Sequence, residues 1–252
     1  LASRARAIAA GLGDDEPDTR DHDAVDAAAR RALRHLSDSG LTRHAVPAPG
    51  ARVSARALCV IREELAAVSG LADAMFIMQG LGSCLISLAG SATIKARYLP
   101  DVARGAAVAA FALTEPEAGS DLGGISTRAA RDGGDYVLDG VKTYISNAGI
   151  ADLYTVLART GEGSSRRDGI SAFVVDAATP GLTVRQRLSI IAPHPIGTIE
   201  FSGCRVPSTH LLGSEGEGHD LALAVLDRFR PTVGAAASGF ARRALEESVS
   251  RS

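Results

Sequence analysis

FALTEPEAGSD, residues 111–121, is the stretch of sequence from which the other segments can be placed. The apolar residues 107–113 predict a buried strand. Pro116 ends it, because proline donates no backbone hydrogen bond and biases the residue before it toward extended geometry. The small residues 118–120 then predict a turn whose backbone N–H groups can approach an anion closely. The stretch therefore predicts a strand end beside an anion-binding turn.

A second segment of the same kind, KTYISN, occupies residues 142–147. Asp139-Gly140 before it is a favourable hairpin sequence, and residues 141–145 predict a strand. Because side chains alternate along a strand, Tyr144 and Ser146 are expected on one face. Taken singly, Tyr144 is more typical of a core residue. Together, the hydroxyls, the aromatic ring and the anion-binding turn suit a flat cofactor with a phosphate tail.

LTEPEAGSD and GVKTYISNAGIAD closely resemble the two signatures of the acyl-CoA dehydrogenase flavoprotein family. The resemblance begins near residues 63–65 and continues to the end of the chain in the family's order. Further matching segments lie at residues 88–91, 98–100, 173–175, 179–181, 204–207, 216–218 and 227–231. The resemblance implies FAD-dependent α,β-dehydrogenation of an acyl-CoA thioester, in which a carboxylate removes the α-proton and a hydride passes to the flavin N5.

The resemblance also implies site residues. Tyr144 would pack on the flavin ring and Ser146 would bond near its N5 atom. Acyl-CoA would contact Ser120, Asp227 and Arg230. The family's base lies late in the C-terminal bundle, beyond residue 252, or at a position that is Phe229 here, so the catalytic base stays unknown. The residues expected to bind FAD are Phe111, Leu113, Thr114, Gly119, Ser120, Tyr144, Ile145 and Ser146.

The first part of the chain is expected to be all-helical. Residues 1–20 are weakly patterned and expected to fray, and residues 44–53 are expected to form a loop. Caps at Asp21 or Asp23, Ser54 and Ser91 predict helix starts, and the expected helices end near residues 39, 68, 88 and 99. The long apolar helix at residues 71–88 is interpreted as buried rather than membrane-spanning, since it holds Asp73 and Gln79.

From residue 107 the pattern changes to short runs separated by glycine and proline turns. It predicts an antiparallel barrel or sandwich with strands at residues 107–113, 125–131, 136–139, 141–145, 153–158, 170–175, 182–187, 198–201 and 204–206. Residues 222–245 then form one apolar helical stripe, which Pro231 is expected to kink. The expected fold class is α+β, with domains at 1–108 (helical), 109–212 (β) and 213–252, the first helix of a bundle. The chain is expected to be cut at both ends.

Composition and residue spacing argue against several classes of function. A net charge of −2 gives no basic field for nucleic acid. Three cysteines without a C-x-x-C pair favour a reducing, cytoplasmic location. Histidine spacing predicts no zinc site, and the glycines at residues 80–82 do not complete a dinucleotide fingerprint. The segment around His194, between Pro193 and Pro195, predicts only a rigid turn. Arg242–Glu246 and Arg243–Glu247 have the spacing of surface ion pairs.

Several alternatives remain open in the sequence. A non-catalytic member or partner subunit would keep the same fold, and an acyl-CoA oxidase would use the same motifs. The resemblance implies fatty acid and lipid metabolism and a homotetramer or homodimer built through the helical bundle. It also implies electron-transfer flavoprotein as the electron acceptor, with oxygen as the acceptor in the oxidase alternative. Acyl-chain length cannot be predicted from these residues.

Overall fold

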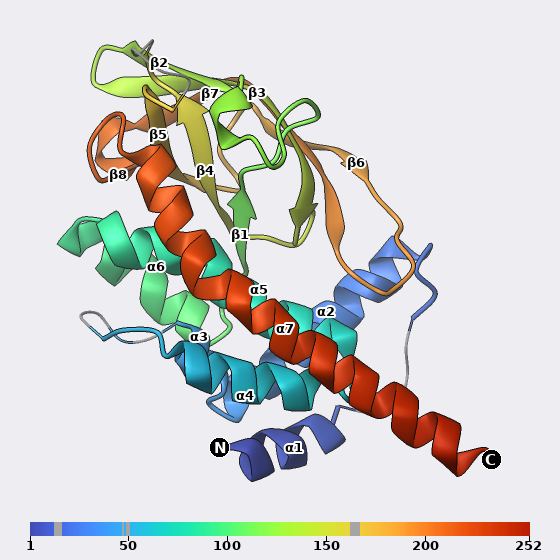
Figure 1. Cartoon of the computed structure of the whole chain (residues 1–252). Coiled ribbons are helices and arrows are strands. Elements are labelled where there is room, and N and C mark those ends of the chain that lie inside the picture. Colours follow the sequence, from blue (N-terminus) through green and yellow to red (C-terminus); the bar gives the residue numbers. More distant parts are fainter. Residues whose placement is uncertain (13–16, 47, 49–50, 162–166) are drawn as a thin grey trace.

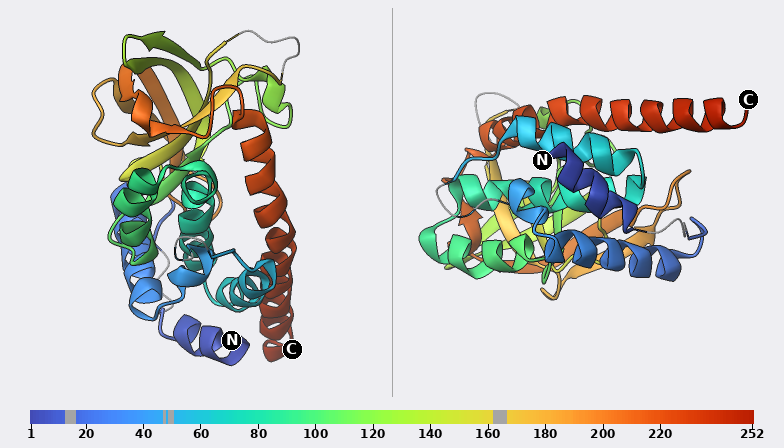
Figure 2. Two further views of the ribbon diagram at one scale, coloured as in Figure 1. Left: turned by 90° about the vertical axis from the view of Figure 1, so that its left-hand side faces the viewer. Right: turned by 90° about the horizontal axis from the view of Figure 1, so that it is seen from below.

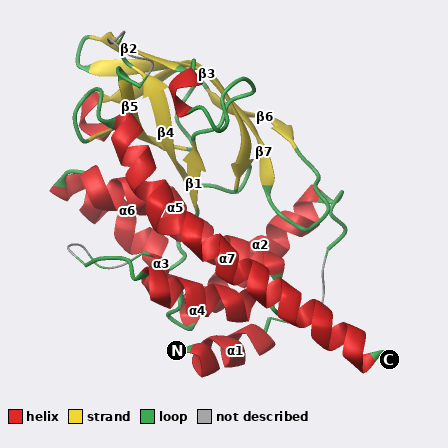
Figure 3. Cartoon of the chain, in the orientation of Figure 1, coloured by secondary structure: helices red, strands yellow, loops and turns green. Residues whose placement is uncertain are grey.

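A computed structural model describes residues 1–12, 17–46, 48, 51–161 and 167–252 of the chain. Six helices form one layer and a β-sheet forms the other, while the C-terminal helix α7 (Gly218–Ser250) runs along both (Figures 1 and 2). Figure 3 shows the same division between helix and strand. The order of a helical part, a sheet and a final helix confirms the α+β fold class.

The helical layer contains α1 (Ala2–Ala10), α2 (His22–Asp38), α3 (Thr42–Ala45), α4 (Ala55–Ala66), α5 (Gly70–Ala89) and α6 (Ala92–Ala103). The side chains of Asp21, Ser54 and Ser91 each accept a hydrogen bond from the backbone N–H three residues on. These N-caps confirm three of the expected helix starts.

One expectation about this layer is wrong. Residues 2–10 form α1 instead of fraying, because Ala5 and Ala9 are fully buried where α1 packs on α4. The expected loop at 44–53 is confirmed at its described residues 46, 48 and 51–53, although residues 44–45 still belong to α3; residues 47 and 49–50 lie outside the described residues. The small alanine side chains that α1 buries form too weak an apolar pattern for this helix to be recognised from the sequence.

Helix α5 is the central helix of the layer. By length and composition it could cross a membrane, but 78% of its apolar window is buried inside the protein. Gly82 lies so close to the first strand that an added Cβ would stand 2.7 Å from the Ala110 nitrogen. The expectation of a buried core helix is therefore confirmed.

The sheet has eight strands, in the order β6-β7-β3-β2-β4-β5-β8, with β1 beside β4. It is mostly antiparallel, but β4 runs parallel to both β1 and β2. β8 is absent from the sequence expectations, and β2 begins at Arg128 rather than at residue 125. The strands are β1 (Ala109–Ala112), β2 (Arg128–Asp132), β3 (Asp135–Ser146), β4 (Leu153–Arg159), β5 (Ile170–Asp176), β6 (Leu182–Arg187), β7 (Ile196–Pro207) and β8 (Leu211–Leu212).

The expected hairpin at Asp139-Gly140 is wrong, because β3 continues through it. The pairing with β7 slips by one residue at this point, which makes a β-bulge. Glycine is required there for close approach, since an added Cβ would lie 2.5 Å from Thr127 Oγ1. The expected strands at 198–201 and 204–206 are likewise one strand, because Gly203, with φ of 59°, lies in the same bulge.

Helix α7 also departs from its expected face. It remains one helix through Pro231. Gly239 lies against α4, where an added Cβ would approach the Glu63 carbonyl oxygen to 2.2 Å. Thr232 is fully buried and accepts a hydrogen bond from Arg62, which also pairs with Asp73. The helix therefore packs through its small residues after Pro231, and the expected single stripe from 222 to 245 is wrong.

Four apolar side chains on α7 stay exposed as a result of this packing. Val233, Phe240, Leu245 and Val249 are 58%, 48%, 66% and 67% exposed. Exposed apolar surface of this kind favours self-association, so sedimentation of the chain is expected to show oligomers or aggregates. Replacing both Leu245 and Val249 by lysine should shift the chain toward monomer, whereas the exposed control Ser250→Lys should not. A wild-type chain that sediments as a single monomer would contradict this prediction.

Candidate functional site

The two signature segments meet at one end of the sheet. Thr143 N–H donates to the Thr114 carbonyl oxygen at 2.9 Å, which joins the end of β1 to β3. The turn after β1 is closed by hydrogen bonds between Glu115 and Ala118 in both directions, at 2.9 and 3.1 Å. The strand end, the turn and the second segment therefore lie together, as the sequence indicates.

A buried ion pair holds this junction. Lys142 Nζ donates to Glu115 Oε1 at 2.8 Å and to the Leu113 carbonyl oxygen at 3.1 Å. Glu115 also accepts from the N–H groups of Ser126 and Thr127, at 2.6 and 3.0 Å. Both ionised groups are buried, so each depends on the other and on these donors. The pair fixes the turn relative to β3.

The same contacts set the ionisation of the pair. Burial alone would raise the pKa of Glu115, but the Lys142 ammonium and the hydrogen bonds from residues 126 and 127 outweigh it and lower that pKa to about 2. Burial lowers the pKa of Lys142 to about 8, against the opposing effect of Glu115. Ionised Glu115 therefore stabilises the fold above pH 4.5, and this contribution is lost as the pH falls toward 2.

Tyr144 is the unusual residue of the site. Its φ is 54°, in the left-handed region, and its side chain is 66% exposed although Lys142 and Ile145 are buried. The β3–β7 pairing slips between Lys142 and Ile145, so Tyr144 lies in a second bulge. A non-glycine residue in this region costs on the order of 1–3 kcal/mol and is typical of functional sites. The bulge turns an aromatic ring out of the sheet toward solvent.

Ser146 bonds to a residue that sequence reasoning missed. His194 Nε2 lies 2.8 Å from Ser146 Oγ. His194 belongs to the loop between β6 and β7, and the next residue, Pro195, accepts a hydrogen bond from Asn147 N–H at 2.7 Å. Burial lowers the pKa of His194. The only sequence signal for this position was the proline on each side of the histidine.

The other residues expected to bind the cofactor differ in how far their side chains are exposed to solvent. Gly119 and Ser120 are exposed, and an added Cβ on Gly119 would meet nothing within 4 Å. Thr114 is half-buried, whereas Phe111, Leu113 and Ile145 are buried in the core. We name the accessible set Thr114, Gly119, Ser120, Tyr144 and Ser146 the Tyr144 face. An exposed ring, three hydroxyls and an open glycine turn fit a planar group with an anionic tail.

The residues expected on α7 do not share one environment. Asp227 and Arg230 are exposed, whereas Phe229 is 4% exposed and lies against Gly80 of α5. Arg243 pairs with Glu247, as the spacing predicts. The predicted Arg242–Glu246 pair is wrong, because Arg242 turns toward α4 and bonds to Glu64 at 2.9 Å. Glu64 is nearly buried and can satisfy its charge only through such partners.

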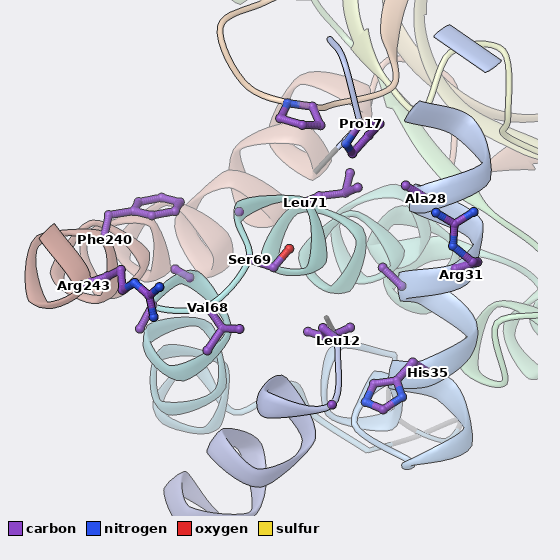
Figure 4. Close-up of a pocket in the computed structure, with 16 residues that line it drawn as sticks. Leu12, Pro17, Ala28, Arg31, His35, Val68, Ser69, Leu71, Phe240 and Arg243 are labelled. Atoms are coloured by element: carbon purple, nitrogen blue, oxygen red, sulfur yellow. The ribbon is translucent and has the colours of Figure 1, made fainter. Parts of the chain in front are cut away.

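A cavity of about 860 Å³ lies among the helices (Figure 4). Leu12, Val68, Leu71 and Phe240 contribute apolar surface, while Arg31, His35 and Arg243 contribute polar groups. Pro193, next to His194, is among its lining residues. The cavity therefore adjoins the β6–β7 loop, and the Tyr144 face itself does not line it.

Two family models match the sequence. The acyl-CoA dehydrogenase N-terminal domain matches residues 3–106, and the acyl-CoA dehydrogenase middle domain matches residues 110–204. The probable acyl-CoA dehydrogenase FadE25 of Mycobacterium tuberculosis is 37% identical over 222 residues, which cover 86% of this chain and 57% of that protein. The chain spans about half the length of the curated relatives it matches.

Solved structures share the same arrangement of helices and strands. Butyryl-CoA dehydrogenase from Megasphaera elsdenii has a TM-score of 0.84 at 26% identity, over 99% of this chain and 67% of that chain. A glutaryl-CoA dehydrogenase from Mycobacterium smegmatis in complex with FADH2 has a TM-score of 0.81 at 28% identity, over 99% of this chain and 63% of that chain. The likeness extends over the helical layer and the sheet together.

Proposed function

Because the chain belongs to the acyl-CoA dehydrogenase family, we propose that it carries the FAD- and acyl-CoA-binding part of an enzyme that dehydrogenates acyl-CoA thioesters between the α and β carbons. The observation that carries this proposal is Tyr144, an exposed aromatic ring held in the left-handed region at the end of a strand. Bound FAD would supply the hydride acceptor. The FADH2 bound by the glutaryl-CoA dehydrogenase supports the choice of cofactor.

The residues of the Tyr144 face have separate proposed roles. Tyr144 would support the flavin ring, and the Ser146 hydroxyl would bond near N5. The exposed Gly119-Ser120 turn would receive the phosphates or the CoA chain, because backbone N–H groups of small residues allow close approach. Phe111, Leu113 and Ile145 would contact the flavin only at the edge of the core, since their side chains are buried.

Substrate binding would extend from this face to α7. Asp227 and Arg230 are exposed on that helix and free to meet the CoA moiety in the proposed complex. The planar guanidinium of Arg230 can pair with phosphate or stack on adenine. Electron-transfer flavoprotein would be the electron acceptor, and the exposed apolar side chains of α7 would contact another copy in a homo-oligomer.

The general base is not assigned to a residue of the Tyr144 face. Glu115 is committed to Lys142 and to two backbone donors, and its pKa of about 2 makes it a poor proton acceptor. Phe229 has no proton-accepting group and lies in the core. Glu115 therefore has a structural role in this proposal.

Two substitutions separate binding from chemistry. Tyr144→Ala should weaken FAD binding, because the ring surface is removed. Ser146→Ala should retain FAD but slow its reduction by acyl-CoA by roughly 10- to 1000-fold, the usual effect of removing one preorganised donor. Fluorescence titration with FAD and stopped-flow reduction in the longest available form of the protein would measure the two effects. Thr183→Ala, an exposed hydroxyl on β6, is the control. Wild-type behaviour of both variants would exclude this face as the flavin site.

A further inference from the structure

The Ser146–His194 pair is a feature for which the proposed reaction gives no reason. The two side chains come from different parts of the sheet, β3 and the β6–β7 loop, and their polar atoms are 2.8 Å apart. Among the described residues, Ser146 Oγ makes no other hydrogen bond. A hydroxyl has a single proton to donate. The direction of this one bond therefore decides whether Ser146 can donate to anything else.

The histidine is held firmly in this position. Pro193 and Pro195 fix the backbone φ on both sides of it. Asn147 N–H donates to the Pro195 carbonyl oxygen at 2.7 Å, and the Asn147 side-chain amide donates to the Ala109 carbonyl oxygen at 2.9 Å. These bonds join the loop, β3 and β1 within one residue of Ser146. The contact is thus built into the junction that also positions Tyr144.

The start of the loop is tied to the helical layer as well. Arg187 pairs with Asp26 of α2, and His22 Nε2 lies 3.0 Å from Ser189 Oγ. Leu188 N–H donates to the Ile196 carbonyl oxygen at 2.9 Å, which closes the loop at its base. The imidazole therefore has little freedom to leave Ser146 without breaking contacts at both ends of the loop.

We infer that His194 is a positioning residue that donates from Nε2–H to Ser146 Oγ and so leaves the Ser146 proton free for the cofactor. This inference rests on the proposed binding of FAD at the Tyr144 face. With the opposite tautomer, Ser146 would donate to Nε2 and have no proton for an acceptor such as the oxidised flavin N5. The histidine thus sets the hydrogen-bond direction at the reacting edge of the ring, and it makes no contact with substrate.

A rival function for the same pair is a nucleophile and its base. A hydroxyl nucleophile needs an adjacent histidine that a third group orients. In the described part of the chain, no hydrogen bond to His194 Nδ1 accompanies the Nε2 contact. The geometry therefore favours the positioning role over a hydrolytic dyad.

The first test reads the tautomer without any cofactor. Nitrogen-15 NMR of the imidazole in the FAD-free protein should show His194 protonated at Nε2 and coupled across the bond to Ser146. A neutral His194 protonated only at Nδ1 would overturn the inference. Labelling of Ser146 by a fluorophosphonate would also overturn it, because that result belongs to the dyad.

The second test uses two variants of opposite effect. His194→Gln keeps an N–H donor near the Nε2 position, whereas His194→Phe keeps a ring but removes the donor. With FAD bound, His194→Phe should weaken the bond to the oxidised N5, which shifts the flavin midpoint potential to more positive values and raises the dissociation constant of oxidised FAD roughly two- to tenfold, the usual effect of one hydrogen bond. His194→Gln should restore both quantities toward wild type.

The outcomes distinguish this inference from the proposed function. Failure of the folded wild type to take up FAD would overturn the proposed function and the role of His194 with it. FAD uptake with the same potential in wild type and His194→Phe would overturn only the role of His194. Melting curves of both variants check the fold, and the tautomer measurement on the wild type decides the question if either variant fails to fold.

Discussion

Lys142→Met should lower the free energy of unfolding by about 3–5 kcal/mol, the usual effect of leaving one partner of a buried ion pair alone. Lys142 is fully buried, and Glu115 is 3% exposed. Methionine retains most of the lysine volume but leaves Glu115 without its counter-charge and removes the donor to the Leu113 carbonyl. A loss of this size is a large part of the 5–15 kcal/mol that holds a typical domain together.

Denaturant unfolding, followed by circular dichroism, would measure this loss. The double variant Lys142→Met with Glu115→Leu should recover much of it, because no unpaired charge is then buried. Arg243→Ala, which removes the exposed pair with Glu247, is the control and should change stability by no more than about 1 kcal/mol. An unfolding free energy of Lys142→Met within about 1 kcal/mol of wild type would mean that Glu115 is satisfied without Lys142.

The second large effect concerns proton removal. Residues 1–252, loaded with FAD and mixed anaerobically with acyl-CoA, should leave the flavin oxidised for many minutes. The described residues place no uncommitted carboxylate at a position that the family uses for its base, since Phe229 is buried and Glu115 bonds to Lys142. A positioned general base contributes about 10²- to 10⁴-fold. A longer form of the chain with a glutamate or aspartate at the family's later position should reduce the flavin faster by that factor.

The flavin absorbance itself is the measurement, with dithionite as the control that the bound flavin can be reduced. Rapid bleaching by residues 1–252 would contradict the expectation, and Glu115→Gln and Glu117→Gln would then identify the base. A longer chain that also leaves the flavin oxidised would instead favour a non-catalytic member of the family.

Much of the fold was predictable because local signals and tertiary packing agree. Serine and aspartate caps started the helices where expected, and strand β6 has the expected bounds. Asp139-Gly140 predicted a hairpin turn, but the same dipeptide also suits a β-bulge. Only the close approach of Thr127 to Gly140 in the folded protein distinguishes the two. On α7, Gly239 packs where an apolar stripe was expected, which no periodicity reveals.

The sequence indicated which two segments meet, but not the contacts that hold them together. No sequence pattern revealed that Glu115 bonds to the N–H groups of Ser126 and Thr127 and to Lys142. Strand alternation placed Tyr144 and Ser146 on one face, but it did not predict the bulge with positive φ that turns Tyr144 outward. His194 lies 48 residues from Ser146, so no local pattern could join them.

Mapping FAD onto the protein by NMR tests the central claim most directly. When FAD is titrated into the FAD-free protein, the account predicts that amide shifts concentrate at Gly119, Ser120, Tyr144 and Ser146, with Arg251 at the far end of α7 unchanged. Shifts that are absent in a folded protein, or that concentrate around Val68 and Phe240 in the helical cavity, would contradict it.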